Sequence, residues 1–215
     1  MTKFKEFSNY LISSGAIGEP SLVHLRRILR QAGLISSGGQ GFASKPLEIF
    51  DITNVFLALV AADQAKNSPA VVRLYRSATV QISHSENCDP WPFTISHDAC
   101  LGEFLDCFFE GMLHGSSHEY QLWTNLRFKF LVTDGYSGVN AKLWFDDGNM
   151  GHVAVFSAFN ADALKRLEVG DSDFMFERAA RVSREASVGD DFLRPLLEFV
   201  IENLFADEVE DQSDV

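Results

Sequence analysis

The chain has 215 residues, of which 46% are hydrophobic and 22% charged, as in an ordinary globular protein with one large domain or two small ones. The sequence contains no run of about 18 apolar residues, so no segment of it is expected to cross a membrane. The three cysteines, an odd number, argue against a disulfide framework and for a reducing compartment. The opening stretch MTKFKEFSNYL mixes charge with apolar residues, so we expect no signal peptide and a cytoplasmic protein.

The net charge of -12 is unevenly distributed. Through residue 80 the chain has nine Lys and Arg against five Asp and Glu, whereas the remainder has nine against 25. Since phosphate contacts need Lys and Arg, this asymmetry indicates a first part that faces nucleic acid and a second part with another role. The acidic part is compatible with a protein partner and equally with a role in solubility alone.

The first elements are two short amphipathic helices. Residues 4–13 place apolar side chains on one helical face, and Ser13–Gly15 ends that helix. A second helix is predicted over residues 21–32, capped by Ser21 and stopped by Gly33 in the left-handed conformation. Leu34 and Ile35 then predict one small strand, followed by a glycine-rich tip over residues 36–41.

Two more helices complete the first part. One is predicted to be capped by Asp51 or Thr53, and the other to run from Ser68 to about Ser77 with Arg73 and Arg76 exposed. The polar, proline-containing residues 79–94 predict a linker. We therefore expect a winged-helix head over residues 1–78.

The second part alternates in a strand pattern. Residues 126–133, 139–145 and 152–159 predict a three-stranded antiparallel sheet, and helices are predicted over residues 99–113, from about 160 to 167, and over 192–204. Residues 172–186 are ambiguous and lean helical. The predicted fold class is α+β, with a mixed oligomerisation or partner domain over residues 95–205 and a disordered acidic tail over 206–215.

The strongest functional pattern is the basic helix before the glycine-rich tip. Arg26 and Arg30 are one turn apart, and the major groove of DNA admits a helix in which Arg reads guanine. The predicted DNA-binding residues are His24, Arg26, Arg27, Arg30, Gln31, Gln40 and Lys45. The alternative is an exposed amphipathic helix with ordinary surface arginines beside a flexible loop.

No catalytic residue, cofactor or metal site is expected. His84, Cys88, His97, Cys100 and Cys107 are of zinc-binding types but contain no CxxC pair, and Cys100 and Cys107 fit small buried hydrophobes on an apolar helix. His114 and His118 flank a Gly-Ser-Ser segment that favours a loop. The carboxylates at 134, 146, 147 and 162 fall at turns and a helix cap, where Asp is common anyway.

The segment HLRRILRQAGLISSGGQG resembles the recognition helix and wing of winged helix-turn-helix proteins. More loosely, it is similar to small DNA-binding proteins of tailed-phage and prophage packaging regions, among them small terminase subunits. The resemblance covers about residues 15–65. It implies a DNA-binding head, an oligomerising middle and a C-terminal segment that engages the packaging motor, in a bacterial or phage-infected cell. Small terminases usually oligomerise through helical hairpins, and the strand pattern of residues 126–159 departs from that.

Together these patterns predict a non-enzymatic protein that binds double-stranded DNA for phage genome packaging, as a homo-oligomer. Two alternatives stay open. One is a winged-helix transcriptional regulator with a dimerisation or ligand domain. The other is a phage or host-defence interaction protein whose acidic domain blocks a basic enzyme.

Overall fold

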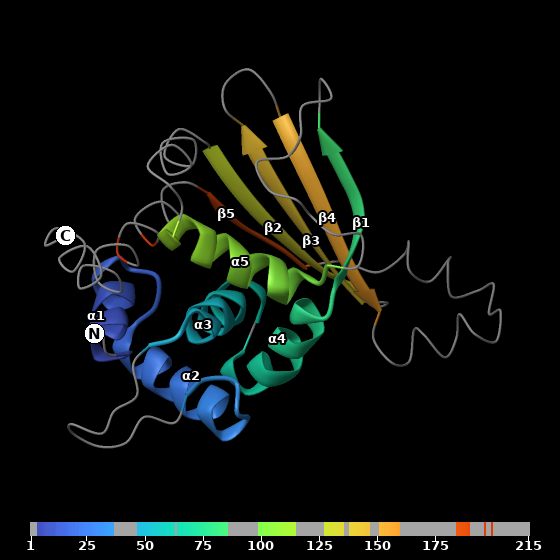
Figure 1. The fold of residues 1–215 in the computed structure, drawn as a ribbon. Coiled ribbons are helices and arrows are strands. Elements are labelled where there is room, and N and C mark those ends of the chain that lie inside the picture. The colour runs from blue at the N-terminus through green and yellow to red at the C-terminus, as the bar shows by residue number, and fades with distance from the viewer. Residues whose placement is uncertain are drawn as a thin grey trace, which may run out of the picture.

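The structure, a computed structural model, is an α+β fold with helices on one side of an antiparallel sheet (Figure 1). It describes residues 4–36, 47–62, 64–85, 99–114, 127–135, 138–146, 151–159 and 184–189, together with Leu196 and Phe199. The helices are α1 (Phe4–Ser13), α2 (Glu19–Gln31), α3 (Ile49–Ala61), the 3-10 turn η2 (Ala65–Asn67), α4 (Ser68–Arg76) and α5 (Leu101–His114). The strands are β1 (Thr79–Ser85), β2 (Arg127–Gly135), β3 (Gly138–Asp146), β4 (Gly151–Phe159) and β5 (Arg184–Gly189).

The sheet has five strands in the order β1-β4-β3-β2-β5, and all of its pairings are antiparallel. The three predicted strands are confirmed as β2, β3 and β4, but the prediction of a three-stranded sheet is wrong because an edge strand is added on each side. β1 carries a register shift between Val80 and Ile82, so these two residues pair with consecutive residues of β4, Phe156 and Val155. β5 is only six residues long, and it occupies part of the segment that leaned helical in sequence.

Helix α2 begins earlier than predicted. It starts at Glu19 with Gly18 as its N-cap and Pro20 in the first turn, so the prediction that Ser21 caps it is wrong. Its end is confirmed, since Gly33 has φ of 70°. Leu34 and Ile35 form a bend and not the predicted strand, and both are buried. Of the glycine-rich tip, residues 37–41 lie outside the described residues.

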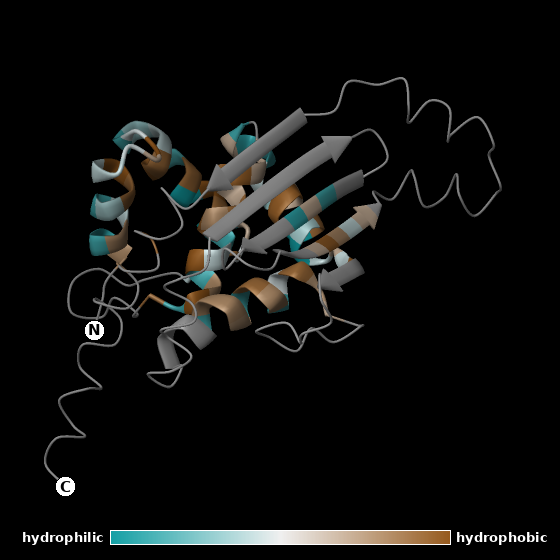
Figure 2. Cartoon of the chain, turned by 90° about the horizontal axis from the view of Figure 1, so that it is seen from above, coloured by the Kyte–Doolittle hydropathy of each residue, from teal (hydrophilic) through white to brown (hydrophobic). Residues whose placement is uncertain are grey.

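Helix α3 is the centre of the fold. Ten of its 13 residues are buried, and it contacts α4, α5 and strands β2 and β5. The predicted cap at Asp51 or Thr53 is wrong, because Glu48 is the N-cap and Asp51 completes a capping box from the third helical position. α3 and α5 are mostly hydrophobic, whereas α2 alternates hydrophilic and hydrophobic residues (Figure 2).

Within the described residues, the predicted head and the predicted second domain share one hydrophobic core. Its buried members run from Phe7 in α1 through Phe56 in α3 to Phe109 in α5 and Phe156 in β4. The first seven residues of the predicted linker are strand β1, which pairs with β4. Of the predicted last helix, Leu196 and Phe199 are described as helical, and the Phe199 ring stacks on Tyr10 of α1 at 4.6 Å between centroids.

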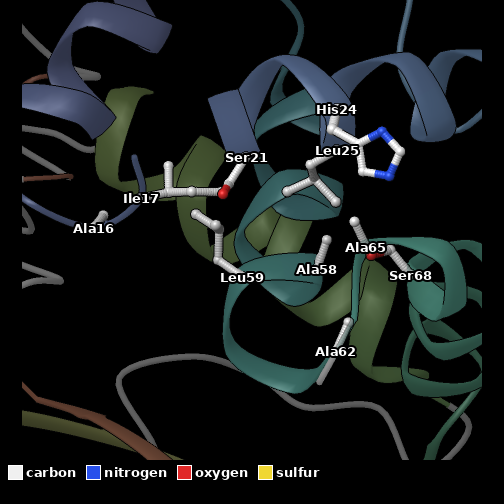
Figure 3. A pocket seen from close by; sticks show the side chains of 10 residues that line it. All are labelled: Ala16, Ile17, Ser21, His24, Leu25, Ala58, Leu59, Ala62, Ala65 and Ser68. Carbon is white, nitrogen blue, oxygen red and sulfur yellow. The ribbon is translucent and has the colours of Figure 1, made fainter. Parts of the chain in front are cut away.

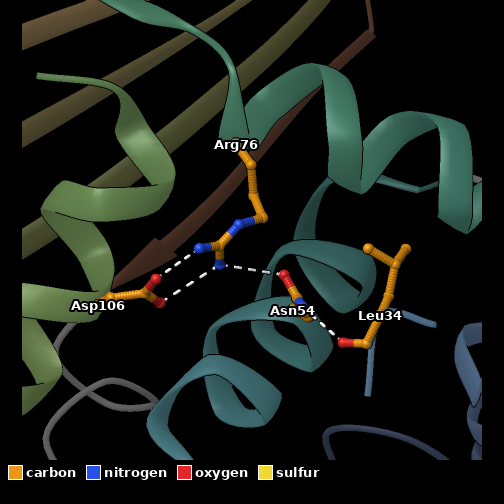
Figure 4. Close-up of polar contacts among 4 residues, drawn as sticks. All are labelled: Leu34, Asn54, Arg76 and Asp106. Atoms are coloured by element: carbon orange, nitrogen blue, oxygen red, sulfur yellow. Dashed lines mark hydrogen bonds and ion pairs between the residues drawn. The ribbon is translucent and has the colours of Figure 1, made fainter. Parts of the chain in front are cut away.

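A polar chain crosses this core (Figure 4). The Asn54 side-chain amide donates to the Leu34 carbonyl, and Arg76 donates to Asn54 Oδ1 at 3.1 Å and forms an ion pair with Asp106. The side chain of Arg76 is only 17% exposed, so the prediction that it is exposed is wrong. A Cβ at Gly102 would lie 2.9 Å from Arg76 Nε, which explains why α5 carries glycine where this arginine crosses it.

Candidate nucleic-acid interface

The sequence pattern of α2 divides this helix into a buried face and a solvent face. Leu22, Leu25 and Leu29 are buried in the core. Because a helix turns by about 100° per residue, the opposite side presents residues 23, 24, 27 and 31, which are all exposed. Arg26 and Arg30 lie between the two faces and are half-buried. The structure thus brings the five predicted DNA-binding residues of α2 onto one flank and ridge of this helix.

Arg26 and Arg30 form the most unusual part of this surface. Burial, together with the neighbouring charge of Arg30, lowers the pKa of Arg26 below its usual value. The Nε atom of each arginine is buried without a hydrogen-bond partner. Among the described residues, no carboxylate forms an ion pair with either guanidinium. Two adjacent positive charges are therefore held at the side of α2 without a counter-charge from the described part of the chain.

The Arg26 guanidinium is held in place by an aromatic ring. It lies over the ring of Phe4 in α1, 4.2 Å from the ring centroid, in a cation–π contact. Sequence reasoning missed this contact, because the helical period assigns Phe4 to the apolar face of α1 and says nothing about what crosses it. The ring supports the guanidinium without neutralising its charge.

The exposed ridge of α2 holds a second contact. Arg27 donates to Nδ1 of His24 over 3.1 Å. When Nδ1 accepts this bond, the neutral imidazole carries its proton on Nε2, which is then a donor. Gln31 is exposed one turn beyond Arg27. The ridge therefore presents donors in a row, as reading of phosphate or base edges requires.

Polar contacts from the core fix the C-terminal end of α2. Arg73 of α4 donates to the Ala32 carbonyl at 2.7 Å, which satisfies an orphan acceptor at that helix end. The buried Asp51 carboxylate accepts hydrogen bonds from Ser36 N at 2.7 Å and from Glu48 N at 3.3 Å. The Asp51 carboxylate therefore joins Ser36, at the end of one described segment, to Glu48, near the start of the next. Gln40 and Lys45, the predicted wing contacts, lie outside the described residues.

The other candidate sites find little support. Among the described residues, no group of three His, Cys, Asp or Glu side chains could hold a metal ion. Cys100 is half-buried and Cys107 is exposed, so the prediction that both are buried is wrong for Cys107. Burial is the main cause that raises the pKa of both thiols, which disfavours the reactive thiolate. Cys88, His97 and His118 fall outside the described residues.

In comparisons with known proteins, no family model matches the chain, and no curated protein or solved structure is detectably similar to it. In the part of the chain that the structure describes, no helix is both long and apolar enough to span a bilayer.

Proposed function

We propose that this protein binds double-stranded DNA through the solvent-facing side of α2, without catalysing a reaction. The observation that carries the proposal is the Arg26–Arg30 pair, whose Nε atoms lack partners and whose charges find no carboxylate among the described residues. Arginine forks bind phosphate oxygens strongly, and a phosphate between two guanidiniums would remove their mutual repulsion. The nucleic-acid backbone presents such phosphates in series.

The arrangement of α2 suits a division of labour on DNA. The half-buried Arg26 and Arg30 would contact the backbone, while the exposed ridge of His24, Arg27 and Gln31 would enter the major groove. Gln40 and Lys45 stay predicted contacts from the wing. The net charge of -12 does not oppose this reading, because exposed charges beyond about 8–10 Å are largely screened at physiological salt.

The test is DNA affinity measured by fluorescence anisotropy across a salt series. Arg26→Ala/Arg30→Ala should weaken binding and lower the log–log salt slope by about 2, since each phosphate contact contributes about 0.9. Arg26→Lys/Arg30→Lys keeps the charge and should retain most of the slope. The matched control is Lys66→Ala/Lys142→Ala, which removes two charges from exposed side chains elsewhere in the described fold.

Two outcomes would overturn this assignment. One is an absence of DNA affinity at any salt, which would favour the alternative of an interaction protein that blocks a basic enzyme. The other is an equal loss of affinity in the arginine variant and in the lysine control, which would show that the loss depends only on the net charge of the protein.

Genome packaging in a small-terminase-like oligomer stays the proposed biological role. Two features support this role. The segment HLRRILRQAGLISSGGQG resembles the recognition helix and wing of winged helix-turn-helix proteins, and the chain has a basic first part followed by an acidic remainder. The mass of the particle in solution separates this role from transcriptional regulation. A closed ring of many subunits supports packaging, whereas a dimer supports a regulator.

A further inference from the structure

A cavity of about 320 Å³ lies beside α2 (Figure 3). From α2 it is lined by Ser21, His24 and Leu25, and the helical period places Arg26 and Arg30 on the other flank. Its walls are polar in part and apolar in part, and they come from the turn before α2, from α2, from α3 and from the start of α4; the apolar part includes Ile17, Leu25, Ala58 and Leu59. This volume falls at the small end of the range of about 300–1,000 Å³ for ligand pockets. Such a cavity accommodates a compact organic molecule with an apolar body.

One polar side chain of this cavity is unsatisfied. Ser68 is 0% exposed, and its hydroxyl has no hydrogen-bond partner in the structure. Figure 3 shows the Ser68 side chain among the residues that line the cavity, with its oxygen turned toward Ala65. A buried hydroxyl without a partner costs stability, so native proteins rarely keep one without a reason. A ligand acceptor on the cavity side would provide the missing partner.

The position of Ser68 in the chain indicates the charge of that ligand. Ser68 is the first residue of α4, a helix of nine residues with Pro69 in its first turn. A helix N-terminus carries partial positive charge and favours anions. The unsatisfied hydroxyl and the helix N-terminus therefore favour the same kind of group, a negatively charged hydrogen-bond acceptor.

The rim of the cavity agrees with an anion. His24 and Ser21 of α2 lie at this rim, and both are exposed. Because Arg27 donates to His24 Nδ1, the neutral imidazole offers Nε2–H as a donor. The residues that line the cavity include no carboxylate and no lysine or arginine. Without a full counter-charge, a singly charged carboxylate fits better than a doubly charged phosphate.

We propose that this cavity binds a small monocarboxylate with a short apolar chain. Its carboxylate would accept from Ser68 at the N-terminus of α4, and its hydrocarbon part would lie along Leu25, Ala58 and Leu59. The site does not depend on the DNA-binding proposal, because neither Arg26 nor Arg30 lines it, although His24 at its rim belongs to both. A ligand here would touch the same helix that carries the arginines.

Hexanoate is a suitable probe, and titration of the full chain followed by NMR chemical shifts is a suitable measurement. Saturable shifts are expected with hexanoate and not with hexylammonium, which has the same chain but the opposite charge. Ser68→Ala should weaken hexanoate binding by about tenfold, because it removes one hydrogen bond to a charged group. Its melting temperature without ligand should be unchanged or higher, since the deleted hydroxyl makes no bond.

A second variant tests the cavity by volume. Ala62→Leu should fill part of the space and abolish hexanoate binding, whereas Ala70→Leu, at an exposed position of α4 outside the lining, should not change it. The proposal fails if hexanoate produces no saturable shifts, if hexylammonium binds equally well, or if both Ser68→Ala and Ala62→Leu bind as the wild type does. These titrations contain no DNA, so their outcome does not depend on whether the protein binds DNA.

Discussion

The arginines of α2 and those of α4 resemble each other in sequence, yet the fold uses them differently. Each helix carries arginines three or four residues apart beside an apolar face. Arg73 and Arg76 of α4 bind other groups of the protein: the Ala32 carbonyl, the Asn54 side chain and the Asp106 carboxylate. Arg26 and Arg30 of α2 have no such partner among the described residues. What faces an arginine decides whether it is structural or free for a ligand.

The position of each helix explains the difference. α4 contacts α2, α3, α5 and strands β3 and β4, so its long side chains meet neighbours on several sides. Arg76 also lies over the Phe50 ring, 4.4 Å from its centroid. α2 lies further from the sheet, and the partner that the structure gives to Arg26 is the uncharged ring of Phe4 (Figure 1). Four sets of variants test this difference.

The largest effect is expected for Arg76→Ala. This change leaves the partly buried Asp106 carboxylate and the side-chain oxygen Oδ1 of Asn54 without their donor, which should cost about 2–4 kcal/mol of unfolding free energy. Urea denaturation followed by circular dichroism measures this loss. Arg73→Ala removes a single bond at an exposed site and should cost about 1 kcal/mol or less. Equal losses in the two variants would contradict the buried role of Arg76.

Asp51→Asn is expected to cost about 2 kcal/mol. The buried carboxylate accepts from Ser36 and from the backbone of Glu48, and an amide replaces one acceptor oxygen with a donor. The same denaturation experiment measures the loss. Glu48→Gln is the control at the exposed N-cap itself, where a smaller loss is expected. An unchanged unfolding midpoint for Asp51→Asn would show that this carboxylate is not an anchor.

Gly102→Ala is expected to cost about 1–2 kcal/mol, because the added Cβ would meet Arg76 Nε at 2.9 Å. In an Arg76→Ala background the contacts with the guanidinium are removed and only the contact with the Cβ of residue 76, at 3.0 Å, is left, so the loss should be smaller. A double-mutant cycle on unfolding free energy measures this difference. A loss of the same size in both backgrounds would place the clash elsewhere.

The smallest effect on stability is expected for Arg26→Ala/Arg30→Ala. The loss of the Phe4 contact should cost about 1 kcal/mol or less, and the relief of repulsion between the two arginines offsets part of it. The same variant is expected to produce the largest loss of DNA affinity. A large loss of unfolding free energy would mean that these arginines are structural, and the contrast with α4 would disappear.

Sequence periodicity was a good guide where a segment pairs with close neighbours in the chain. The spacing of Phe4, Phe7 and Leu11 predicts α1 with the bounds that the structure has, and the strict alternation of residues 126–159 predicts β2, β3 and β4 to within about two residues. The periodicity could not find β1, because its apolar alternation is limited to Val80 and Ile82 and its partner β4 lies some 70 residues later.

In the candidate site, too, the sequence predicts the features that depend on one helix and not those that depend on a neighbouring one. The amphipathic pattern of α2 is enough to predict that Leu22, Leu25 and Leu29 are buried and that His24, Arg27 and Gln31 are exposed. It is not enough to predict the ring of Phe4 below Arg26 or the unsatisfied hydroxyl of Ser68, since both depend on where another helix crosses.

By itself, then, the sequence determined the helices α1 to α5, the three central strands, the α+β class and the concentration of positive charge on α2, because backbone propensity and hydrophobic period act over a few residues. Only the tertiary structure decided that residues on both sides of position 78 share one core, that the sheet has five strands, and that Arg76 is internal while Arg26 and Arg30 are not. These features depend on contacts between residues far apart in the chain, and a local pattern carries no record of which distant group will face a side chain.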